Sequence, residues 1–154
     1  MSLELEIVIN EPFQASLIKP LFQTKEDIKL ASPLFKFPFN EKEWEASFSH
    51  DPQKSSLLFQ LNEQTIGHIA FLPNGEDLYM CYVIVLEEYR GQKLAKQMIK
   101  QAEEFCRLNY PHQDLYLNVE EKNLKAKGLY EKLGYETLTH EFKKFKMKKK
   151  LRSY

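Results

Sequence analysis

The spacing of apolar residues changes period along the chain, and each change predicts a different element. Apolar and polar residues alternate over residues 3–9, which predicts a first strand. Thr24–Asp27 resembles a capping box and Asn40–Glu43 resembles a second, so a short helix is expected after each. The prolines of Pro33–Phe39 argue against a helix or a central strand between them.

The middle of the chain has the pattern of a strand meander that runs into a helix. Strands are predicted over Leu57–Leu61 and Thr65–Leu72, and Asn74-Gly75 predicts a hairpin into a further strand, Leu78–Val85. The apolar period then lengthens to that of a helix. The apolar face of this helix comprises Leu94, Ala95, Met98, Ile99, Ala102, Phe105 and Cys106.

The last part of the chain continues with a strand, a helix and two strands. Leu115–Val119 alternates as a strand with one buried face, Asn123 can cap the next helix, and Gly134 ends it. Tyr135–Thr139 and Phe142–Met147 predict the final strands. The elements together predict an α/β fold of the α+β kind, with a mixed, mostly antiparallel sheet flanked by helices. No linker or repeat interrupts residues 1–154, so a single domain is expected.

Composition narrows the class of protein without choosing a ligand. The 43% hydrophobic content indicates a globular chain, and the 22 basic and 22 acidic residues cancel, so net charge favours neither nucleic acid nor an anionic membrane. Cys81 and Cys106 fall on apolar faces and are interpreted as reduced core residues. Because no apolar run approaches membrane length and Met1–Glu6 lacks a basic signal region, a cytoplasmic protein is expected.

The loop between Val85 and Leu94 has the features of a phosphate site. It delivers a strand directly into a helix N-terminus, where free backbone N–H groups and the helix dipole favour an anion. Arg90 adds a cation, and Gly91 allows the backbone to approach a ligand closely. A plain strand-to-helix connection is the alternative. The spacing matches neither a P-loop nor a dinucleotide-binding fingerprint, which argues against a nucleotide triphosphatase or a dinucleotide oxidoreductase.

A second motif gives this loop a family context. The run Asn123-Leu-Lys-Ala-Lys-Gly-Leu-Tyr-Glu-Lys-Leu-Gly-Tyr135 resembles the Asn-x-x-Ala-x-x-Leu-Tyr-Glu-Lys-Leu-Gly-Phe segment of the GCN5-related N-acetyltransferase (GNAT) superfamily. The loop Arg90-Gly-Gln-Lys-Leu-Ala95 is similar to the coenzyme A loop of that family, Arg/Gln-x-x-Gly-x-Gly/Ala. The resemblance covers Leu57–Met147 in good order and the first half loosely.

The resemblance implies the GNAT fold and an acetyl-CoA-dependent N-acetyltransferase without a metal. A small-molecule or peptide amine would attack acetyl-CoA directly in a ternary complex. Strands Leu78–Val85 and Leu115–Val119 would splay apart, and Val83 and Val85 would bond the pantetheine through their main chain. The residues implied to hold the diphosphate, mainly through backbone N–H groups, are Arg90, Gly91, Gln92, Lys93, Leu94 and Ala95.

Two further residues take roles from the resemblance, and each has a structural alternative. Tyr130 matches the family tyrosine that hydrogen-bonds the sulfur of the leaving thiolate, although its helical position alone would indicate a core tyrosine. Asn123 would contact CoA, or cap its helix, or do both.

The sequence departs from the family pattern in two places. Lys93 stands where the pattern has its central glycine, so a degenerate loop that no longer binds CoA is an alternative. Residues 79–85 contain no acid to serve as general base. The substitutes are ordered water and four side chains: His68, Asp77, Glu87 and Glu120. We therefore expect an acceptor with a low amine pKa, since deprotonating a lysine-like amine at pH 7 costs about 4.6 kcal/mol.

Two groups of residues leave further alternatives open. Aromatic residues before the first meander strand form either an acceptor wall or core packing, which is preferred: Phe35, Phe37, Phe39 and Trp44. The basic tail Phe142–Arg152 is interpreted as a charged edge strand, with a nucleic-acid contact as the alternative. The rival functions are a catalytically silent CoA-binding module and an RNA-associated protein that uses this tail. A homodimer is also open.

Overall fold

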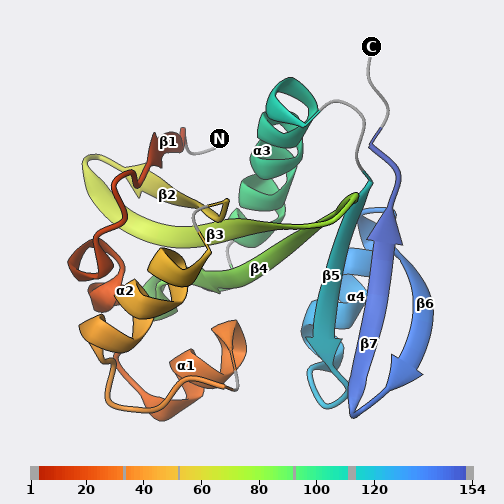
Figure 1. The fold of residues 1–154 in the computed structure, drawn as a ribbon, viewed down its shortest axis with the longest axis horizontal. Coiled ribbons are helices and arrows are strands. Elements are labelled where there is room, and N and C mark those ends of the chain that lie inside the picture. Colours follow the sequence, from red (N-terminus) through yellow and green to blue (C-terminus); the bar gives the residue numbers. More distant parts are fainter. Residues whose placement is uncertain (1–3, 33, 52, 92, 111–113, 152–154) are drawn as a thin grey trace.

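The computed structural model describes residues 4–32, 34–51, 53–91, 93–110 and 114–151. Its strands alternate with helices in much the order that the sequence predicts (Figure 1). In chain order the elements are β1 (Glu6–Ile9), the 3-10 turns η1 (Ala15–Leu17) and η2 (Lys19–Leu21), α1 (Lys25–Ala31), α2 (Glu41–His50), β2 (Ser55–Leu61), β3 (Gln64–Asn74), β4 (Asp77–Val85), η3 (Glu87–Tyr89), α3 (Leu94–Asn109), β5 (Leu115–Glu120), α4 (Leu124–Lys132), β6 (Glu136–Glu141) and β7 (Lys144–Lys149).

The strands form one sheet, and its order confirms the mixed, mostly antiparallel arrangement. Seven strands run in the order β1-β2-β3-β4-β5-β7-β6, and only β4 and β5 are parallel neighbours. The helix starts agree with their predicted caps. The Thr24 side chain accepts from the Asp27 amide in a complete capping box, and Asn40 accepts from the Glu43 amide.

The parallel pair is short, and this leaves a gap in the middle of the sheet. Among the described residues, β4 and β5 pair only at Leu78 with Leu115 and at Tyr79 with Tyr116. Beyond these residues the two strands diverge, as Figure 1 shows. Backbone polar groups along the diverging edges have no partner strand, so they need another hydrogen-bonding partner. The predicted splay is confirmed.

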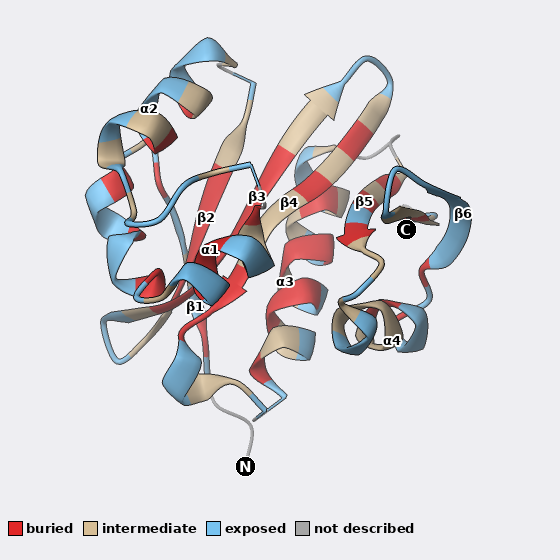
Figure 2. Cartoon of the chain, turned by 90° about the horizontal axis from the view of Figure 1, so that it is seen from below, coloured by how far each residue is buried: buried red, intermediate tan, exposed pale blue. Residues whose placement is uncertain are grey.

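Helices cover the two faces of the sheet differently. α1 and α2 lie on one face of β2–β4, α3 lies on the other, and α4 backs β5 and β7 (Figures 1 and 2). The buried residues line the surfaces where these layers meet. The largest fully buried side chains include Trp44, Phe59, Phe71, Leu78 and Met98.

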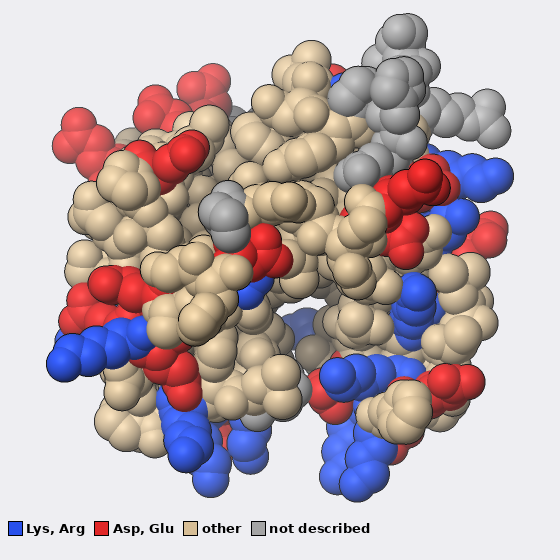
Figure 3. Space-filling model, in the orientation of Figure 1, with Lys and Arg blue, Asp and Glu red and all other residues tan. Residues whose placement is uncertain are grey.

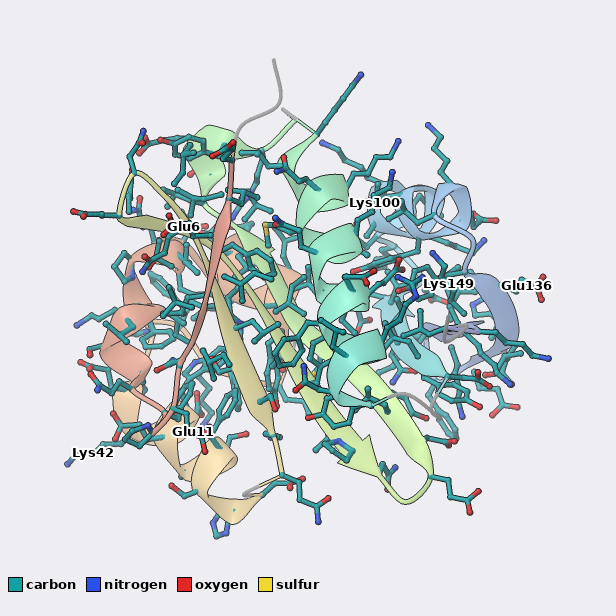
Figure 4. All side chains as sticks on the ribbon, turned by 90° about the horizontal axis from the view of Figure 1, so that it is seen from above. Glu6, Glu11, Lys42, Lys100, Glu136 and Lys149 are labelled. Atoms are coloured by element: carbon teal, nitrogen blue, oxygen red, sulfur yellow. The ribbon has the colours of Figure 1, made fainter. Side chains whose placement is uncertain are left out.

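A buried carboxylate ties α3 to the C-terminal strands. Glu103 is 3% exposed and accepts hydrogen bonds from the Tyr135 hydroxyl at 2.7 Å and from Lys149 Nζ at 3.0 Å. Figure 4 shows Lys149 lying between α3 and β6. The two sides of the gap are therefore joined through α3 as well as through the short parallel pair.

The prediction of an edge strand in the basic tail is wrong. β7 lies inside the sheet, paired with β5 on one side and β6 on the other, and β6 is the edge. The physical reason is burial, because Met147 of β7 is fully buried whereas every residue of β6 is exposed. The turn at Phe142 and Lys143, both at positive φ, joins β6 to β7.

Candidate active site

The loop before α3 presents free backbone donors beside the gap. Gly91 has φ 79° and Lys93 has φ 64°, and Lys93 is the N-cap of α3. The Gln97 amide donates to the Lys93 carbonyl at 3.3 Å. The amides of Leu94 and Ala95 come earlier in the first turn and therefore have no carbonyl partner within the helix. These amides and the positive end of the helix form an anion site. Gln92 lies outside the described residues.

Lys93 takes the backbone conformation that a glycine would adopt most easily. Its left-handed φ carries a strain of about 1–2 kcal/mol for a residue with a Cβ. The loop thus keeps a glycine-like path despite the substitution. The side chain is exposed, and α3 adds Lys96 and Lys100 to the same surface hollow. These two lysines, at helical spacing from Lys93, were missed in the sequence analysis although their spacing could have identified them.

Arg90 does not present a free cation to the phosphate site. Its Nε donates to the Val85 carbonyl at 2.7 Å and its guanidinium pairs with Asp27 at 2.7 Å. Its own amide donates to the Glu87 carbonyl at 3.2 Å. Arg90 therefore fixes the loop against the end of β4 and the start of α1.

The Asp27 carboxylate accepts the hydrogen bond from the Arg90 guanidinium. It is 2% exposed and also accepts from the amides of Gln23 and Thr24, both at 2.9 Å. Burial alone would raise the pKa of Asp27, but the hydrogen bonds from Arg90 and from these two amides hold it below its usual value. A capping carboxylate at the start of α1 is thus linked to the loop before α3.

β4 contains an irregularity next to the gap. Its pairing with β3 shifts register between His68 and Ala70, and Tyr82 has φ 51°. Val83 follows Tyr82 and is half-buried. It lies beyond the two residues at which β4 pairs with β5, so it belongs to the unpaired part of β4. Val85 is buried, and its carbonyl already accepts from Arg90. Of the two valines, Val83 is the freer to offer its main chain.

The imidazole of His68 hydrogen-bonds the backbone of this bulge at Tyr82. It is fully buried, with Nδ1 2.8 Å from the Tyr82 carbonyl and Nε2 2.8 Å from the Ser56 hydroxyl. A carbonyl only accepts, so Nδ1 carries the proton and Nε2 accepts from Ser56. Burial lowers the pKa of His68 to about 4. Both ring nitrogens are engaged, so His68 does not fit the role of general base.

The other proposed bases lie apart from one another. Asp77 begins β4 at its hairpin end, opposite Asn74. Glu87 is exposed in η3, and Glu120 ends β5 opposite Lys144. None of these positions shows a contact with Tyr130 among the described residues.

Tyr130 and Asn123 both belong to α4 and its cap. Tyr130 is 7% exposed and stands edge-on to Tyr135, with ring centroids 5.6 Å apart. Burial raises the pKa of Tyr130 above its usual value, so the hydroxyl keeps its proton and acts as a hydrogen-bond donor. Asn123 uses its side-chain oxygen to accept from the Ala126 amide at 3.2 Å, which confirms the predicted cap.

The aromatic residues combine core packing with an exposed wall. Trp44 is fully buried and packs against Phe35 at 4.2 Å and Phe39 at 5.3 Å between ring centroids. Phe37 is 47% exposed and lies outside this core. Phe35 also stacks on Tyr82 of the bulge at 5.6 Å, and both rings are only half-buried. The preferred interpretation, core packing, holds for Trp44.

The gap opens on the face that carries α1 and α2. Figure 3 shows an opening between that part of the molecule and the part built from β5 and β7, with mostly uncharged surface around it. None of the described helices is long and apolar enough to cross a membrane.

Comparison with known proteins gives this arrangement a family. The model of the acetyltransferase (GNAT) family matches residues 23–135, which is more than half of the chain. The fold is similar to that of an acetyltransferase from Thermus thermophilus, at 18% identity and TM-score 0.79, covering 97% of this chain and 98% of that one. It is also similar to a spermidine N-acetyltransferase from Vibrio cholerae in complex with CoA and spermine, at 19% identity and TM-score 0.75, covering 96% and 95%.

A third similar structure is the ribosomal-protein-S18-alanine N-acetyltransferase from Escherichia coli, at 16% identity and TM-score 0.75, covering 98% of this chain and 96% of that one. Identities this low establish the fold that these proteins share with the chain. The match to the family model goes further, because it spans both the loop before α3 and the Asn123–Tyr135 segment. The chain therefore belongs to the GNAT family of acetyltransferases.

Proposed function

We propose that the protein transfers an acetyl group from acetyl-CoA directly to an amine bound in the same complex. The observation that carries this proposal is the gap between β4 and β5, which opens beside the free amides at the start of α3. A long thioester with a diphosphate at one end fits such a site, because the diphosphate needs the donors of the loop and the pantetheine amides need the unpaired strand edges.

Each part of the site has its own task. The amides of Lys93, Leu94 and Ala95 bind the diphosphate, while Gly91 lets the backbone approach it. Val83 offers main-chain bonds to the pantetheine from the unpaired part of β4, and Asn123 has its side-chain nitrogen left for a contact with CoA. Acetyl-CoA supplies the activated thioester.

The chemistry requires a neutral amine and a stabilised sulfur. In the proposed reaction a C–N bond to the amine replaces the C–S bond of the thioester, and the proton that the amine loses is returned to the thiol. Tyr130 donates a hydrogen bond to the leaving sulfur, and its raised pKa favours donation over full proton transfer. We assign proton removal from the amine to water, because no carboxylate of β4 lies beside the bulge.

A thiol-release assay tests this proposal. Acetyl-CoA with a broad amine panel is expected to give steady thiol release, with acetylated amine confirmed by mass spectrometry. Tyr130→Phe should lower kcat about 10- to 100-fold with little change in the KM for acetyl-CoA. Tyr110→Phe is the matched control, because Tyr110 caps the other end of α3 and its hydroxyl contacts Ser55. CoA binding without turnover of any amine would identify a silent module and overturn the catalytic proposal.

The basic tail offers less free charge than its sequence indicates. Lys148 pairs with Asp114 at 3.2 Å, and Lys149 pairs with Glu103 at 3.0 Å. The RNA-associated alternative therefore has no observation here that favours it over acetyl transfer.

A further inference from the structure

The entrance for the acceptor is set by where the donor would lie. The loop before α3 and the gap would hold the carrier from the α3 side, so the thioester would reach the opposite face of the sheet, which carries α1 and α2. The acceptor must approach from that face. Any inference about the acceptor rests on the proposed function, because the structure of this entrance bears on which amines can bind and not on whether an acetyl group is transferred.

The entrance has an aromatic wall that ends in a fixed cation. Lys54 Nζ donates to the Ser47 hydroxyl at 2.8 Å, to the Ser47 carbonyl at 3.3 Å and to the Tyr82 hydroxyl at 3.3 Å. It also lies 5.3 Å from the ring centroids of Phe48 and Tyr82. All these partners are neutral. Within the described chain Lys54 has no ion pair, so its charge is oriented but not neutralised.

A second lysine lies at the closed end of the gap, where β4 and β5 are still paired. Lys146 belongs to β7, and its Nζ is 5.1 Å from the ring centroid of Tyr116 and 5.7 Å from that of Tyr79 in β4. Hydrogen bonding to Tyr79 raises the pKa of Lys146, so it is protonated at neutral pH. It too has no ion pair with a described residue. Lys54 thus places positive charge beside the bulge at Tyr82, and Lys146 places it over the paired ends of β4 and β5.

No carboxylate of the described residues forms an ion pair with either lysine. Asp114 is paired with Lys148, and Glu120 lies opposite Lys144 in the register of β5 and β7. Asp51 and Asp77 are close enough to influence Cys81 and Lys146 respectively, but neither forms an ion pair with a described residue. A polycationic acceptor would therefore meet the like charge of Lys54 at the entrance, whereas an anionic group would meet a preoriented partner.

We infer that the acceptor is a small amine that also carries a carboxylate, which pairs with Lys54 while its apolar body lies against Phe35 and Tyr82. Lys146 adds a second positive charge at the paired end of β4 and β5. Such a ligand belongs to the amino-acid class. The stacked, half-buried rings of Phe35 and Tyr82 favour an apolar side chain over a polar one.

Matched acceptors separate the carboxylate from the rest of the molecule. Phenylalanine and phenethylamine share the aromatic body and differ by the carboxylate, and spermidine represents the polycationic class. We expect wild-type kcat/KM to be highest for phenylalanine and lowest for spermidine. Lys54→Met should lower kcat/KM for phenylalanine about tenfold more than it lowers kcat/KM for phenethylamine, the scale of one charged hydrogen bond. Because each amine has the same basicity with either enzyme, the comparison between enzymes isolates Lys54.

Three variants keep the test independent of folding. Lys146→Met should give a smaller loss in the same direction, and Lys54→Glu should favour spermidine over phenylalanine. Lys42→Met is the charge-matched control, since Lys42 is exposed on α2 at the outer edge of the molecule (Figure 4). Turnover of phenethylamine or spermidine that equals or exceeds that of phenylalanine, or equal losses for both aromatic amines in Lys54→Met, would overturn the inference. Those results would leave acetyl transfer intact. A failure of every amine tested to give thiol release would instead count against the proposed function.

Discussion

Replacing Lys93 by glycine is expected to stabilise the protein, although it removes a side chain. Lys93 has φ 64° and ψ 12° at the N-cap of α3, and its side chain makes no cap hydrogen bond. A residue with a Cβ is strained there by about 1–2 kcal/mol. Glycine relieves this strain but gains about 0.4–1 kcal/mol of entropy in the unfolded chain. The net gain is about 0.5–1 kcal/mol, and glycine is also a good N-cap residue.

The assay is thermal and urea unfolding of three proteins side by side. For a chain of this size Lys93→Gly should raise Tm by about 2 °C. Lys93→Ala is the control, because alanine keeps the strained φ while losing the charge, so it should not raise Tm. If alanine and glycine stabilise equally, the cause is the lost charge beside Lys96 and Lys100, and the strain argument is refuted.

Two further predictions concern residues that hold the site in place. Asp27→Asn should lower the free energy of unfolding by about 2 kcal/mol at neutral pH, because Arg90 loses its carboxylate. Since the pKa of Asp27 is lower folded than unfolded, its contribution is complete above the unfolded pKa and disappears as the pH falls through the folded pKa. Urea titrations of wild type and variant should therefore converge in acid, and a constant difference would exclude the ion pair as its source. His68→Leu should lower kcat, whereas His68→Asn, whose amide can donate to the Tyr82 carbonyl, should keep most of it; equal kcat losses in both would refute the positioning role.

Local signals in the sequence account for most of the fold. The capping residues Thr24 and Asn40 and the Asn74-Gly75 turn are encoded within a few residues, so the corresponding helix starts and hairpin were predicted correctly. The position of β7 was not, because strand order depends on which neighbours bury Met147 rather than on local alternation.

The site was predictable in its backbone and less so in its side chains. The loop Arg90–Ala95 follows from a strand, a glycine and a helix start that are adjacent in sequence. The partner of Arg90 does not, since Asp27 lies 63 residues away and pairs with it only through the packing of α1. The role of His68 was likewise hidden, because it depends on a bulge in the neighbouring strand at Tyr82.

The central claim is that the gap between β4 and β5 binds the acyl carrier, with its diphosphate on the amides of Lys93, Leu94 and Ala95. A crystal structure of the protein with CoA tests it most directly. The account predicts density for the diphosphate within hydrogen-bond distance of those amides and for the pantetheine along Val83. An empty gap at saturating CoA, or CoA bound elsewhere on the surface, would contradict it.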